Sequence, residues 1–201
     1  MTDTAARPLA GTAEVHVLFS GYVDTDRSPW SVASTVTYVR DGDVQIIVDP
    51  GFVPGTDSIL GPLRDRGIRP QDITDVVFSH HHPDHTMYAG LFPNAAVHDH
   101  WAIYRGTDWE DSECDGRRLT PSVVLARTPG HTAEDLATVV GTPDGLVVCT
   151  HSWFNASTTV DDESPEDAEA LHASRAAILG AADLIIPGHG PAFRPTAETP
   201  S

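Results

Sequence analysis

The chain has 201 residues, of which 12 are Lys or Arg and 29 are Asp or Glu, so its formal net charge at pH 7 is −17. A chain of this length suits one domain with a single substantial core, and we expect that domain to span residues 1–201. So acidic a protein repels phosphate groups, which argues against nucleic acid and against anionic membranes as partners.

The chain ends and the two cysteines carry few signals. Residues 1–10 are polar and lack the apolar segment of a signal peptide. No run of about 18 apolar residues occurs, so no transmembrane helix is predicted. Cys114 and Cys149 make neither a disulfide framework nor a zinc-binding spacing. We expect a cytoplasmic protein that acts on a small molecule, and a homodimer is left open.

Strands are predicted where β-branched and aromatic residues form short apolar runs between turn residues. These runs cover residues 15–19, 34–39, 44–48, 75–78, 95–98, 122–126, 137–140, 146–149 and 184–186. Asp-Gly at 41–42 indicates a hairpin between the second and third runs. The segment 20–31 is predicted to be a loop, and the acidic segment 107–115 a solvated one.

Helices are predicted at residues 57–66, 86–91 and 165–179. Thr56 or Asp57 can cap the first helix and Gly67 can end it, while Pro165 suits the start of the last. Strand pairs interrupted by helices predict two sheets packed face to face with helices outside. Periodicity alone supports an α/β or α+β class and nothing finer.

The segment 79–85 is the feature around which the chain is organised. It follows the predicted strand at 75–78 and places His80, His82, Asp84 and His85 in the order His-x-His-x-Asp-His. Imidazole nitrogen and carboxylate oxygen are ligand atoms that suit zinc, iron and manganese. His80 and His82 lie two apart on an extended segment and can share one metal, while Asp84 and His85 follow where a second can bind. The intervening His81 and Pro83 are expected to set geometry.

Three further histidines each follow a predicted strand directly. His131, His151 and His189 lie in loops that begin TPG, VCT and IPG. Strand ends converge at one edge of a sheet, so residues there can meet although they are distant in sequence. The remaining candidates, His16, His98, His100 and His172, lack this placement, and we expect them to be structural.

These motifs together resemble the metallo-β-lactamase superfamily. The resemblance rests on VDPG at 48–51, the His-x-His-x-Asp-His segment, TPGHT around His131 and PGHGP around His189, and it spans residues 15–191. LFPNA at 91–95 and the tail up to residue 194 are most similar to the branch of metallo-β-lactamase domain-containing protein 1. The resemblance implies a four-layer αββα sandwich.

Carried over position by position, the resemblance implies two metal ions. His80, His82 and His131 would hold the first, and Asp84, His85 and His189 the second. The chain departs from the family at His151, where most hydrolases of this fold have an aspartate that bridges the two metals. We expect His151 to bind one metal, or else the site to hold one ion tightly and one weakly. Cys149 is a minor candidate ligand.

The chemistry implied is hydrolysis of an ester, thioester, lactone or amide by a metal-bound hydroxide, with zinc as the expected metal. Asp84 would orient the attacking hydroxide and pass a proton to the leaving group. Aromatic residues that could line a pocket, although they belong more often to a core, are Tyr22, Trp30, Trp101, Tyr104, Trp109, Trp153 and Phe154. An alternative is an iron-dependent oxidoreductase of the same fold, and a third is a binding protein without catalysis.

Overall fold

The structure, a computed structural model, describes residues 7–158 and 165–201. A seven-stranded sheet has the order β1-β4-β5-β6-β7-β8-β9, with bounds Glu14–Phe19, Val36–Asp41, Val44–Val48, Asp75–Val77, Ala96–His98, Ala102–Arg105 and Asp108–Asp111. A five-stranded sheet runs β10 to β14, with bounds Arg118–Thr120, Val123–Arg127, Leu136–Thr142, Gly145–Thr150 and Leu184–Pro187. A short hairpin pairs β2 (Tyr22–Asp24) with β3 (Ser31–Ala33). The helices are α1 (Asp57–Asp65), α2 (Pro83–Thr86) and α3 (Ala168–Leu179).

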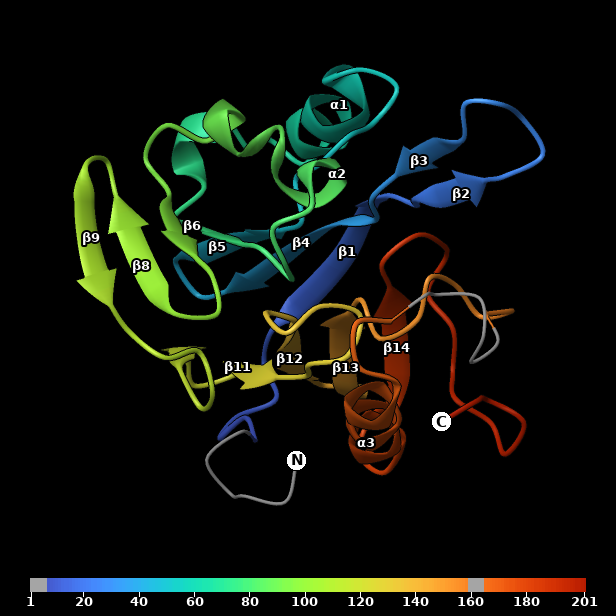
Figure 1. The fold of residues 1–201 in the computed structure, drawn as a ribbon. Helices are drawn as coiled ribbons and strands as arrows, with labels where there is room; N and C mark the ends of the chain where they lie inside the picture. The colour runs from blue at the N-terminus through green and yellow to red at the C-terminus, as the bar shows by residue number, and fades with distance from the viewer. Residues whose placement is uncertain (1–6, 159–164) are drawn as a thin grey trace.

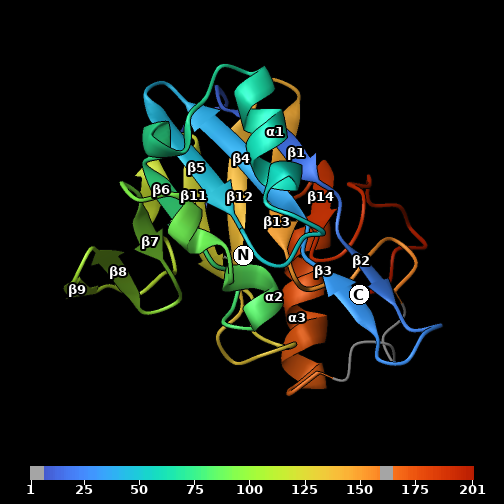
Figure 2. The same ribbon diagram turned by 90° about the horizontal axis from the view of Figure 1, so that it is seen from above.

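The two sheets pack face to face because their strands alternate between two apolar faces. On β5, Ile46 and Val48 enter the core between the sheets, whereas Ile47 faces the cluster that includes Leu63 of α1. On β13, Val148 faces the opposite way, into the cluster that includes Ile178 of α3. The helices therefore cover the outer faces, as Figures 1 and 2 show. The predicted four-layer αββα sandwich is confirmed.

Strand direction brings several loops to one edge of the sandwich. β5, β6 and β7 are parallel to one another, and so are β13 and β14. β11 has the same direction as β13, because each is antiparallel to β12 between them. The carboxyl ends of β6, β11, β13 and β14 are followed by the loops that contain the candidate histidines.

Three local predictions were wrong, one because a strand found a pairing partner and two because of the residues at helix starts. The segment 20–31 contains β2, which is paired with β3 rather than left as a loop. In place of the helix expected at 86–91, α2 begins at Pro83, whose fixed φ suits the first helical position, and ends at Thr86, and a separate 3-10 turn covers Ala89–Leu91. The last helix begins at Ala168 rather than at Pro165, because the Asp167 carboxylate accepts a hydrogen bond from the Ala170 N–H and caps it there.

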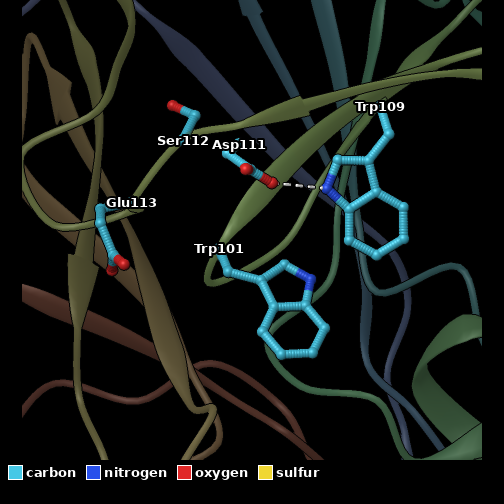
Figure 3. Close-up of a pocket in the computed structure, with 5 residues that line it drawn as sticks. All are labelled: Trp101, Trp109, Asp111, Ser112 and Glu113. Carbon is cyan, nitrogen blue, oxygen red and sulfur yellow. Dashed lines mark hydrogen bonds between the residues drawn. The ribbon is translucent and has the colours of Figure 1, made fainter.

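The acidic segment 107–115 also departs from its prediction. Asp108–Asp111 forms β9, which pairs with β8 at the edge of the larger sheet, although all four residues are exposed. Trp109 lies on this hairpin, and its indole N–H donates a hydrogen bond to Asp111 at 2.9 Å (Figure 3). The conformation of this segment is determined by pairing with β8, which the acidic composition of the segment does not reveal. Within the described ranges, no helix is long and apolar enough to cross a membrane.

Candidate metal centre

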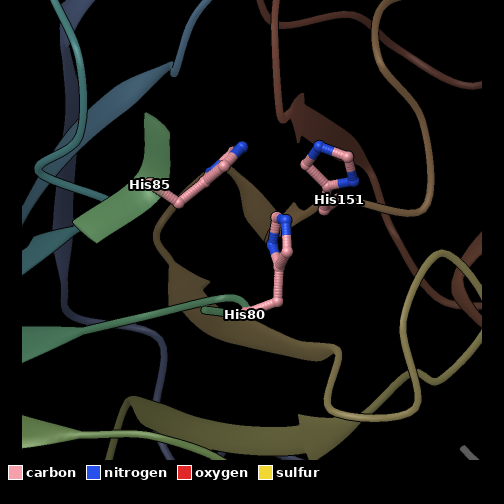
Figure 4. Close-up of side chains that lie close together, drawn as sticks. All are labelled: His80, His85 and His151. Carbon is pink, nitrogen blue, oxygen red and sulfur yellow. The ribbon is translucent and has the colours of Figure 1, made fainter. Parts of the chain in front are cut away.

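Seven predicted ligands converge at the edge of the sandwich from five places in the chain. His80 and His82 follow β6, Asp84 and His85 lie on α2, and the other three histidines follow β11, β13 and β14. The groups of side chains whose potential ligand atoms all lie within 4.8 Å of one another include His80–His82–His131, Asp84–His85–His189 and His80–His85–His151. Figure 4 shows the three rings of the last group pointing toward a shared space.

The first group is formed by ring nitrogens at short range. His82 Nδ1 lies 2.9 Å from His80 Nε2 and 3.2 Å from His131 Nε2. His80 is buried, with its Nδ1 3.0 Å from the Ser79 hydroxyl, whereas His82 is exposed. Three imidazole nitrogens in one place match the three protein ligands of a zinc site with an open fourth position.

The second group has its ring orientations set by acceptors behind it. His85 Nδ1 donates to the Asp49 carboxylate at 2.9 Å, and His189 Nδ1 donates to the Ala33 carbonyl at 2.9 Å. Each ring therefore turns Nε2 toward the site, where the two Nε2 atoms lie 3.4 Å apart. The Asp84 Oδ2 atom lies 3.4 Å from the first and 3.7 Å from the second.

This arrangement fits a cation. With both rings neutral, two nitrogen lone pairs and one carboxylate face one another with no hydrogen between them. Only a positive charge, either a proton or a metal ion, relieves that contact. The Nδ1 partners of His85 and His189 are the acceptors that usually orient metal-binding histidines. The donor set of imidazole and carboxylate thus suits a divalent metal.

His151 lies between the two groups. Its Nε2 is 3.0 Å from Nε2 of His189, and its ligand atom is within 4.8 Å of those of His80 and His85. β13 ends at Thr150, so His151 is the first residue after the strand, and its side chain is buried. The position expected for a bridging carboxylate thus holds a ring nitrogen that contacts the second group.

Burial and charge act on these histidines in opposite senses. Burial, and then the neighbouring rings, lower the pKa of His80 and that of His151 well below the usual range, and lower the pKa of His189 to about 4. Burial also lowers the pKa of His85, but the Asp49 and Asp84 carboxylates outweigh it, so its pKa is raised. The rings are therefore mostly neutral, as metal ligands must be, while carboxylates on the second group favour added positive charge.

Two supporting residues were not singled out from the sequence. Asp49 accepts hydrogen bonds from the Ser79 N–H at 2.7 Å and from His85, and it has a positive φ of 51°. Asp135 is buried and accepts from the N–H and hydroxyl of Thr132, beside His131. Burial raises the pKa of the Asp135 carboxyl to about 7. Asp49 directly follows β5, which is parallel to β6, so it lies at the same edge of the sheet as the histidine segment. An acidic residue at the end of a strand is the signal that could have identified it.

The remaining candidates lie elsewhere or serve other contacts. Cys149 is buried in the apolar core between the sheets and belongs to none of the ligand groups found among the described residues, so the structure does not support it as a ligand beside His151. His81 turns away from the two groups and contacts Asp99 and Glu134 at 3.2 and 2.6 Å. Its Asp99 partner is buried, and with His100 they form a further close group of potential ligands.

A sequence profile of the Metallo-beta-lactamase superfamily matches residues 30–191. The chain belongs to this superfamily. Metallo-beta-lactamase domain-containing protein 1 of Xenopus laevis is 36% identical over 191 residues, which are 90% of this chain and 81% of that protein. The human protein of the same name is 37% identical over 158 residues, and there the match spans 74% of this chain and 59% of the relative.

Solved structures of the superfamily share the fold at low identity. A Thermotoga maritima protein assigned to the metallo-beta-lactamases has a TM-score of 0.72 and 23% identity, over 92% of this chain and 100% of that one. A dizinc quorum-quenching lactonase has a TM-score of 0.62 and 15% identity, over 85% and 79% of the two chains. Members of this superfamily are hydrolases that bind divalent metals, and the chain is an enzyme of that superfamily.

Proposed function

We propose that the chain is a binuclear metallohydrolase that cleaves an ester, thioester, lactone or amide bond in a small molecule. The observation that carries the proposal is the pair of three-residue groups, His80–His82–His131 and Asp84–His85–His189, at one edge of the sandwich. Two adjacent groups with separate ligands fit two ions rather than one. Zinc is the metal that best suits this set of imidazole ligands.

When bound, a divalent metal lowers the pKa of a coordinated water from about 16 to about 7 and so supplies a nucleophile at neutral pH. The contribution of the chain is to place acids and bases around it. Asp84 is partly exposed and lies beside both ring nitrogens of the second group, so it can hold a proton that passes to the leaving group. Asp49 keeps His85 in one orientation from behind.

An apolar cleft beside Asp84 supports a substrate with an apolar group near the bond that is cleaved. The cleft has a volume of about 480 Å³ and is lined by Trp30, Ser31, Val32, Phe52, Pro83 and Asp84. Trp30 is 69% exposed and Phe52 is 39% exposed, so both offer uncovered apolar surface. Phe154 packs against the rings of His131, His151 and His189 and adds an apolar wall, whereas Trp153 is buried in the core.

The test is hydrolysis of a panel of lactones, thioesters and esters by protein of known metal content. His82→Ala removes an exposed ligand with little cost to folding and should abolish turnover. His16→Ala removes a histidine of β1 outside the site and is the matched control, so it should leave turnover unchanged. Near wild-type turnover by the His82 variant would refute the assignment.

Metal analysis of protein purified without added metal separates this proposal from the redox alternative. Colourless zinc at about two ions per chain supports hydrolysis. Bound iron, with oxygen consumption in place of hydrolysis, would contradict it. Trp30→Ala should raise KM for substrates with an apolar acyl group and leave kcat nearly unchanged, because Trp30 lines the cleft and offers no atom to the metal-ligand groups.

A further inference from the structure

A second cleft lies on the β8–β9 side of the molecule, and none of its lining residues is a predicted metal ligand. It has a volume of about 470 Å³ and is lined by Trp101, Trp109, Asp111, Ser112 and Glu113 (Figure 3). The two indoles are 44% and 61% exposed, and their ring centroids lie 6.2 Å apart. Two large aromatic side chains left uncovered side by side are a feature of binding surfaces.

Both indoles are held in place by hydrogen bonds. Trp101 Nε1 donates to the Tyr104 hydroxyl at 2.9 Å, and that hydroxyl donates to the buried Asp99 carboxylate at 2.6 Å. Trp109 Nε1 donates to Asp111, and its ring makes a T-shaped contact with Tyr104, with 4.9 Å between the centroids. The His100 ring packs against Trp101 with 4.5 Å between the centroids. Because both N–H groups have partners, the indoles offer a ligand the π faces that remain exposed. Their fixed positions reduce the entropy cost of binding.

The charges around the cleft are negative. Asp111 and Glu113 line it, and among the described residues neither has an ion-pair partner. Of the arginines nearby, Arg105 pairs with Glu110 at 3.8 Å. Arg117 is directed to the backbone, where its Nη1 atom donates to the carbonyls of Asp99 and Ala102. The cleft thus combines aromatic faces with two carboxylates that form no ion pair among the described residues, although the partly buried Arg117 guanidinium attracts Glu113 at longer range.

We propose that this cleft binds a small organic cation of the alkylated ammonium class. An indole face attracts a cation through its ring quadrupole, and most strongly when Trp supplies the face. The N-methyl groups of such a cation also bury apolar surface on the rings, which a hydrated metal ion cannot do. The carboxylates of Asp111 and Glu113 add Coulomb attraction and disfavour anions. A neutral sugar can stack on Trp but gains nothing from the two charges.

Calorimetric titration of the full chain with choline tests the proposal, with 3,3-dimethylbutan-1-ol as the neutral analogue of the same shape. We expect saturable binding of choline alone, with shifts in the indole N–H signals of Trp101 and Trp109 among the four tryptophans. Trp109→Leu should weaken binding about tenfold. Tyr22→Leu, which alters an exposed aromatic residue outside both clefts, should leave choline binding unchanged.

A second variant separates charge from shape. Asp111→Asn retains an oxygen acceptor for the Trp109 N–H but removes the negative charge, so choline should bind at least threefold more weakly while thermal unfolding stays as in wild type. Equal binding of the neutral analogue, or unchanged affinity in both the Trp109 and Asp111 variants, would overturn the proposal. So would binding of a lysine-rich peptide without binding of choline, since the surface would then be a protein-docking site.

Discussion

At the scale of single residues, the second group of candidate ligands depends on atoms that never face the metal. The Asp49 carboxylate and the Ala33 carbonyl each accept a hydrogen bond from a histidine Nδ1–H, and so each determines which nitrogen carries a lone pair toward the site. Asp49 serves a second purpose, because its other oxygen accepts the Ser79 N–H at the start of the histidine segment. One carboxylate therefore joins α2 to the loop after β6.

Asp49→Asn should weaken binding of one metal ion about 10–100-fold while the fold is kept. Asparagine tolerates the positive φ of 51° at this position, but its single amide oxygen cannot serve both Ser79 and His85. Competition with a chelator measures the loss. Asp75→Asn is the matched control. Asp75 lies outside the ligand groups and pairs with His98 at 2.7 Å, so this variant should leave metal affinity unchanged. Equal losses in both variants would contradict a specific role for Asp49.

His151→Ala should remove mainly one ion and leave the other, because His80, His82 and His131 still form a three-histidine group. His151→Asp should fold normally and retain two ions, since a carboxylate neutralises charge between them. Metal content and titration of wild type and both variants provide the measurement. If the alanine variant binds both ions as tightly as wild type, His151 lies outside the coordination sphere.

At the scale of elements, the position of α2 depends on a close approach of two backbones. Phe52 N–H donates to the Asp84 carbonyl at 2.9 Å, and at Gly51 a Cβ atom would lie 1.6 Å from that same oxygen. Only glycine leaves room for the helix that holds Asp84 and His85. Gly188 has a comparable role, since a Cβ atom there would lie 2.4 Å from Cδ2 of His151.

Gly51→Ala should displace α2, lower the free energy of unfolding by about 1–3 kcal/mol and reduce metal content. Gly90→Ala is the control, because a Cβ atom there meets nothing within 4 Å. Urea unfolding and metal analysis of the two variants give the comparison. If the two variants have the same midpoint of urea unfolding and the Gly51 variant keeps its metal, Gly51 is not required for the position of α2.

At the scale of the whole molecule, the net charge of −17 opposes polyanionic substrates. The acidic strand β9 is exposed. A second acidic run covers residues 161–169, of which 161–164 lie outside the described residues. We predict that the metal-loaded protein neither binds nor cleaves RNA or DNA. The assay is oligonucleotide binding and cleavage at physiological ionic strength, with ester hydrolysis by the same preparation as the positive control. Binding that weakens steeply with added salt would argue against the prediction.

Much of the fold and of the site could be inferred from local sequence, because the relevant signals act over a few residues. Short apolar runs of β-branched and aromatic residues identified most strands, and the spacing of His80, His82, Asp84 and His85 indicated metal ligands before any contact was known. The segments that were misjudged, such as β2 and β9, owe their strand conformation to pairing with a neighbour. Their own composition is polar and typical of loops.

The orientation of the site could not be read from the sequence, because it depends on contacts between residues far apart in the chain. His189 receives its orientation from Ala33, 156 residues earlier, and His85 receives its orientation from Asp49, 36 residues earlier. Cys149 is buried in the core between the sheets, whereas His151, the first residue after β13, lies among the ligand groups. Side-chain direction at a strand end is set by packing and hydrogen bonding of the assembled loops, and these exist only once both sheets have formed.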